Sequence, residues 1–100
     1  MSVKVDPVGL ASAAASTAGL SAETAAHTAQ AAAAGMVLPP GLEEISAANA
    51  AKIAGYAAEV AAVLSGASAM QALYGVANAA AGTVMSLEDA ANAVLMNTVL

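Results

Sequence analysis

The sequence of 100 residues contains no cysteine, phenylalanine, tryptophan or arginine. Without cysteine it has no disulfide framework, no thiolate metal site and no cysteine nucleophile. Two lysines against seven acids give a formal charge of -5. Such a chain repels phosphate, so binding of nucleic acid through a basic face with stacking aromatics is excluded. The chain has one histidine, and a Ser-His-Asp arrangement would have to use it. One histidine with scattered acids is also a poor ligand set for zinc.

Alanine dominates what is present, with 32 residues among an apolar fraction of 60%. Alanine favours the helix more than any other residue, but it buries only one methyl group, worth roughly 0.8 kcal/mol. Small domains are already marginal because of their surface-to-volume ratio. Disorder is not expected, because disordered chains are poor in apolar residues. The composition therefore indicates one helical domain that completes its core with another chain.

The first helix is expected over residues 7–34. Asp6 is a natural N-cap, and Pro7 at the first helical position has its φ already set and lacks a donor that would go unused. Gly35 follows the last alanines of this segment, and glycine commonly ends helices. Pro39 and Pro40 then interrupt the chain, which predicts a turn over residues 35–41.

A second, long helix is expected from about Pro40 to about Ala81, with Gly82 as its end. Residues 86–89 read as a capping box that opens a short third helix. Because short connectors make neighbouring helices antiparallel, we predict an all-α fold. It is an antiparallel two-helix hairpin, residues 1–82, that completes a four-helix bundle with a partner chain. Residues 83–100 form a C-terminal tail.

The larger apolar residues of the second helix, Leu64 among them, recur with helical spacing. At about 100° per residue they fall in one stripe about 120° wide, with Lys52 and Glu59 at one edge. Gly55, Gly66 and Gly75 interrupt this helix and indicate close contacts with other helices. We predict that the partner interface consists of Leu42, Ile45, Ile53, Tyr56, Val60, Val63, Met70 and Tyr74.

No group of residues indicates catalysis. His27 lies mid-helix, and Glu23 is the one acid placed to partner it, so we interpret it as a solvent-facing or partner-facing side chain rather than a base. The acid pairs Glu43-Glu44 and Glu88-Asp89 are each expected in the first turn of a helix, where carboxylates complement the dipole. We predict no enzymatic activity, no metal, no cofactor and no small-molecule substrate.

Residues 60–87 carry no formal charge and are long enough to span a bilayer. The segment nevertheless contains Ser65, Gln71 and Asn78, and its flanks are acidic rather than basic. A transmembrane helix is therefore not favoured. The N-terminus lacks a leucine-rich segment ahead of a cleavage site, so we expect no signal peptide.

Several segments resemble the PE family of mycobacteria, which are small alanine-rich helical hairpins exported by type VII secretion and paired with PPE proteins. Residues 5–10, followed by Ala13 and Ala14, are similar to the family opening V-x-P-E-x-L-x-x-A-A. Pro39-Pro40 and then residues 43–46 resemble the segment between the helices. The same register continues through residues 50–53 and 90–93.

Two positions depart from the family pattern. Val8 stands where the family has the glutamate of its Pro-Glu pair. The family's export signal, Y-x-x-x-D/E, follows the second helix; in register, Asp89 takes the acid position, but Met85 takes the tyrosine position. The resemblance thus makes Met85 and Asp89 the candidate export signal, in a degenerate form.

The resemblance implies a non-enzymatic interaction protein that forms a heterodimer with a PPE-family protein in the cytoplasm. It also implies export through an ESX system, with the secretion chaperone and the ESX machinery as indirect partners, to the cell envelope or the medium. From the residues alone, a second hypothesis stays open. A self-associating alanine-rich bundle without an export role would use the same apolar stripe.

Overall fold

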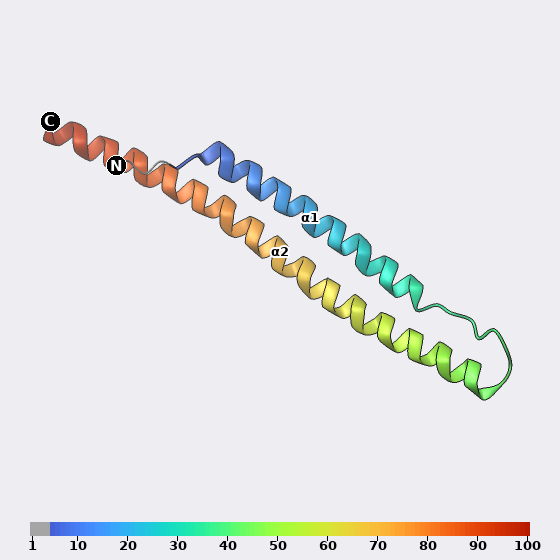
Figure 1. Ribbon diagram of the computed structural model, residues 1–100. Coiled ribbons are helices and arrows are strands. Elements are labelled where there is room, and N and C mark those ends of the chain that lie inside the picture. Colours follow the sequence, from blue (N-terminus) through green and yellow to red (C-terminus); the bar gives the residue numbers. More distant parts are fainter. Residues whose placement is uncertain (1–4) are drawn as a thin grey trace. The chain divides into compact units, whose positions relative to one another are not determined.

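The computed structural model describes residues 5–100, which form two α-helices, α1 (Pro7–Ala34) and α2 (Glu44–Val99). Residues 35–43 connect them without regular structure (Figure 1). The two helices run antiparallel and pack against each other. The predicted all-α hairpin and its turn are confirmed.

The bounds of α1 follow from local chemistry at both ends. The Asp6 carboxylate accepts a hydrogen bond from the Val8 backbone N–H at 3.1 Å, as expected for an N-cap. At the other end, the N–H groups of Gly35 and Met36 each donate to the carbonyl three residues earlier at 3.1 Å, which tightens the last turn. Gly35 does not adopt a positive φ, so the helix ends without the left-handed cap.

The predicted end of the second helix at Gly82 and the predicted third helix are wrong. α2 begins at Glu44 instead of Pro40 and continues to Val99. Gly82 keeps a negative φ, and a Cβ at this position would lie 3.4 Å from the Leu10 Cβ. The Ser86 hydroxyl donates to the Gly82 carbonyl at 2.9 Å rather than capping a new helix. The small size of Gly82 therefore serves a helix contact, not a stop.

The chain divides into two compact units, Leu20–Met70 and the remaining segments on either side of it. In both units most of the less exposed helical residues recur at intervals of three or four, which is the pattern of a helix–helix contact. We call these residues the seam. They are, on α1, Leu10, Ala14, Thr17, Ser21, Thr24, Thr28 and Ala31, and on α2, Ser46, Ala50, Ala57, Ala61, Leu64, Ser68, Gln71, Gly75, Asn78, Ala81 and Gly82.

The seam contains almost no large apolar side chain, and none of the hydrophobic residues that the structure describes is buried. The helices approach through small residues instead. A Cβ at Gly75 would lie 3.5 Å from the Thr17 Cβ and 3.4 Å from the Ala14 carbonyl oxygen. A Cβ at Gly55 or Gly66 would meet no atom within 4 Å. Of these three glycines in α2, only Gly75 makes a close contact with α1.

This difference predicts opposite effects of filling two glycines. Gly66→Ala should stabilise the chain by about 1 kcal/mol, because alanine favours the helix and the added methyl meets open space. Gly75→Leu should destabilise it by about 1–3 kcal/mol, because the side chain would enter an already filled contact. Thermal unfolding of the full-length variants, followed by circular dichroism, measures both. Shifts of the same sign would contradict this description of the seam.

Candidate protein-binding interface

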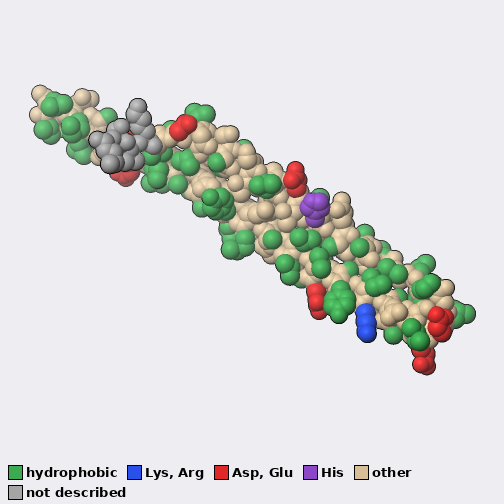
Figure 2. All heavy atoms as spheres, viewed as in Figure 1, with side chains coloured by type: hydrophobic (Ala, Val, Ile, Leu, Met, Phe, Trp, Pro, Cys, Tyr) green, Lys and Arg blue, Asp and Glu red, His purple; other side chains and the backbone are tan. Residues whose placement is uncertain are grey.

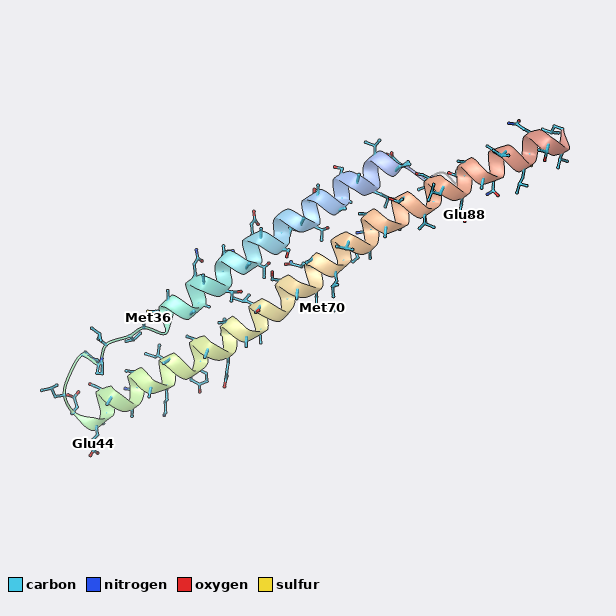
Figure 3. The ribbon with its side chains drawn as sticks, turned by 180° about the vertical axis from the view of Figure 1, so that it is seen from behind. Met36, Glu44, Met70 and Glu88 are labelled. Carbon is cyan, nitrogen blue, oxygen red and sulfur yellow. The ribbon has the colours of Figure 1, made fainter. Side chains whose placement is uncertain are left out.

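The eight residues predicted to bind a partner all lie exposed on or immediately before α2. Figure 3 marks Met70 along this helix, between Glu44 and Glu88. Ile53 is the least exposed of the eight, at 43%, and Tyr56 is 68% exposed. Seven of them belong to the unit Leu20–Met70, and Tyr74 belongs to the other unit. We call the eight residues the apolar stripe.

The apolar stripe and the seam occupy different positions on α2. Leu64, which the sequence pattern groups with the stripe, is half-buried on the seam. Leu64 also lines an open hollow of about 320 Å³, together with Glu59, Val60 and Val63. Because α1 packs against the small residues, the larger apolar side chains of α2 remain available for a second contact.

Charged groups are few on this surface. Figure 2 shows them as isolated patches on the face it displays, among hydrophobic side chains and backbone. Among residues 5–100, no three histidine, cysteine or acidic side chains gather where they could hold a metal ion. His27 is exposed, and its Nδ1 lies 3.0 Å from the Gln30 side-chain oxygen.

A short hydrogen-bonded turn positions the first residues of the stripe. The Ser46 hydroxyl donates to the Glu43 carboxylate, and the Ala47 N–H donates to the Glu43 carbonyl at 3.3 Å. The hydrogen bond from Ser46, with a second from the Glu43 backbone N–H, lowers the pKa of Glu43 below its ordinary value of 4.5. Leu42 precedes this turn and Ile45 lies within it.

The candidate export residues lie on the helical C-terminal part of α2. Met85 and Asp89 are one helical turn apart, and both are exposed. Met85 lines a hollow of about 400 Å³ with Val5, Asp6, Gly9 and Leu10. The interpretation of Glu88-Asp89 as acids of a first turn is wrong, because both residues lie inside a continuous helix.

Sequence reasoning missed several exposed apolar residues of α2. Leu73 and Val76 lie outside the apolar stripe, and Val94, Leu95 and Met96 lie within the predicted tail. Their spacing matches no single helix face, so a search for one amphipathic stripe could not find them. It also missed the hydrogen bonds between Ser21 and Ser68.

By length and composition α2 could also cross a membrane. A mostly buried core helix of a soluble protein passes the same test, but only 6% of the most apolar segment of α2 is buried. The uncharged segment 60–87 carries Ser68 and Gln71 on the seam, and its flanks are acidic and add no basic anchor. We therefore assign no membrane span to this helix.

Comparison with known proteins gives one match. The model of the PE family matches residues 3–92. No curated protein and no solved structure matches the chain at the threshold applied. The matched region includes both helices up to residue 92, with the complete apolar stripe and both candidate export residues.

The lowered pKa of Glu43 predicts an acid-sensitive start of α2. Because the folded pKa lies below the unfolded value, the carboxylate contributes stability above the unfolded pKa, and this is lost as pH falls through the folded pKa. We expect the helical signal to fall below about pH 4.5. Glu43→Gln and Ser46→Ala should both reduce this dependence in circular dichroism titrations. A titration unchanged in both variants would contradict the assignment.

Proposed function

Because the chain belongs to the PE family, we propose that it is the PE half of a heterodimer with a PPE-family protein, exported as a pair by an ESX system. PPE pairing and ESX export are typical of the family, and PE proteins are generally non-catalytic. In this proposal the two helices complete a four-helix bundle with helices of the partner, after assembly in the cytoplasm.

The observation that carries the proposal is the exposed apolar stripe, together with the absence of any buried apolar side chain among residues 5–100. The accessible surface is 7370 Å², whereas a compact monomer of this mass exposes about 5,000 Å². Burial of each large apolar side chain contributes about 1.5–3 kcal/mol. A partner that covers the stripe therefore supplies the burial that the seam of small residues cannot.

One observation favours self-association as a second candidate. Lys52 and Glu59 are seven residues apart, on either side of Tyr56. In an antiparallel contact between two copies centred on Tyr56, each Lys52 would lie opposite the other copy's Glu59. Sizing of the chain purified alone separates the candidates. A folded homo-oligomer supports self-association, whereas poor folding that a co-expressed PPE protein rescues supports the heterodimer.

The partner contact has a matched pair of test variants. Val60 and Val76 are exposed to 50% and 67%, but at about 100° per residue they point to opposite sides of α2. Val60→Asp places an unpaired charge in the proposed contact and should weaken the PPE complex at least about 100-fold. Val76→Asp should leave it intact. Co-purification measures both.

The assignment of the stripe would be overturned if Val60→Asp co-purified normally with the partner, or if Val76→Asp weakened the complex equally. Tyr56→Asp repeats the test one helical turn earlier and should behave as Val60→Asp does. Helix content, followed in parallel, separates loss of the contact from loss of the fold.

The export role of Met85 and Asp89 is tested by secretion. Met85→Ala or Asp89→Ala should block export without weakening the partner complex, because neither residue belongs to the apolar stripe. Glu88→Ala is the control, since it removes the same charge from the neighbouring position and should leave secretion unchanged. Met85→Tyr should raise secretion, because it restores the family's tyrosine. The secreted fraction, measured by immunoblot with the partner present, reports each result.

Normal secretion after deletion of residues 84–100 would remove the export role from this segment. The signal would then lie on the partner. Loss of secretion in Glu88→Ala would also contradict the assignment. Export would then require negative charge in this segment rather than the spacing of Met85 and Asp89.

A further inference from the structure

Two serines link α1 and α2 inside the unit Leu20–Met70. The Ser21 hydroxyl donates to the Ser68 carbonyl at 2.9 Å, and the Ser68 hydroxyl donates to the Ser21 carbonyl at 2.9 Å. The two hydroxyl oxygens lie 3.2 Å apart. Since each hydroxyl has one proton, the pair makes two hydrogen bonds at a time. Each serine side chain thus bonds to the backbone of the opposite helix.

These are the only hydrogen bonds between the two helices among residues 5–100. The other seam hydroxyls that form hydrogen bonds do so locally: Ser46 donates to the Glu43 carboxylate just before α2, and the threonines of α1 donate within α1. Thr24 donates to the Leu20 carbonyl at 2.9 Å, and Thr28 donates to the Thr24 carbonyl at 3.1 Å. These hydroxyls therefore form no hydrogen bond with α2.

Apolar packing around the serine pair selects the alignment of the helices only weakly. The neighbouring seam residues are mainly alanine and threonine, with Leu64 as the one large side chain of this unit's seam. If one helix slid by one turn, about 5.4 Å, most small residues would again face small residues. Ser21 would lose Ser68, however. The connector, residues 35–43, has no regular structure to oppose such a slide.

We propose that Ser21 and Ser68 form a register latch, meaning a polar pair that fixes which turn of α1 faces which turn of α2 in this unit. A polar residue in an otherwise uniform helix contact is a known way to specify register. The latch does not depend on the partner or on the proposed export. It provides the alignment that a seam without large side chains does not provide by shape.

Disulfide trapping tests the latch, because the chain has no cysteine of its own. A Cβ at Gly35 would lie 2.8 Å from the Ala57 Cβ, whereas a disulfide needs about 3.5–4.5 Å between these atoms. Gly35→Cys with Ala57→Cys therefore cross-links after a local shift of about 1 Å, far less than one helical turn, and reports the native register. Gly35→Cys with Ala61→Cys reports a slide of about one turn, and Gly35→Cys with Ala50→Cys reports a slide of about two turns in the opposite direction. Each pair is built into the full-length chain with both serines, and again with Ser21→Ala and Ser68→Ala.

With both serines, the Gly35/Ala57 pair should cross-link and the two displaced pairs should cross-link slowly. The double alanine variant should raise the rate of at least one displaced pair roughly tenfold relative to the native pair, the factor expected for two lost hydrogen bonds. Thr24→Ala is the control, because it removes a seam hydroxyl that links nothing across the helices. It should leave the ratio unchanged.

An unchanged ratio in the double variant, or an equal rise in Thr24→Ala, would overturn the latch. Ser21→Ala alone provides a second test. It keeps the hydrogen bond from the Ser68 hydroxyl to the Ser21 backbone carbonyl, so its ratio should lie between those of the parent and the double variant. If circular dichroism shows that the double variant loses its helix, this single variant and Ser68→Ala decide the question.

Discussion

The contact between α1 and α2 through small side chains is the constraint on which the rest of the structure depends. Alanine, serine, threonine and glycine let two helices approach closely, as at Gly75 and Gly82. The same residues remove little apolar area from water. A helix pair built this way gains its geometry from close approach, and it leaves the larger apolar side chains of α2 on other faces, exposed to solvent.

Signals from neighbouring residues in the sequence were sufficient to predict both ends of α1. Asp6 and Pro7 start α1, and Gly35 follows its last residue, as predicted. Gly82 shows where such reasoning fails, because a glycine can either end a helix or admit a neighbouring side chain. Only the position of Leu10 on α1 decides between the two. At Gly82 the helix continues beside Leu10, a tertiary contact that no local pattern contains.

The exposed apolar side chains of α2 were predictable in part. A search for large apolar residues found the exposed stripe, but it assigned Leu64 to the stripe although this residue lies on the seam. The seam escaped notice because its residues differ little from the surrounding alanines. Its spacing of three and four is visible only once burial is known. The Ser21–Ser68 bonds depend on the alignment of two helices, which sequence spacing within one helix cannot give.

Gly55 and Gly66 lower the stability of the isolated chain. Each costs about 1 kcal/mol relative to alanine inside a helix, and neither has an atom within 4 Å of the place where a Cβ would lie. Within the chain, nothing offsets this cost, and no buried apolar side chain compensates for it elsewhere among the residues described. The isolated hairpin therefore holds its shape by helix propensity, the seam and one polar pair. The large apolar side chains of the apolar stripe stay exposed in the isolated chain and add little to this stability.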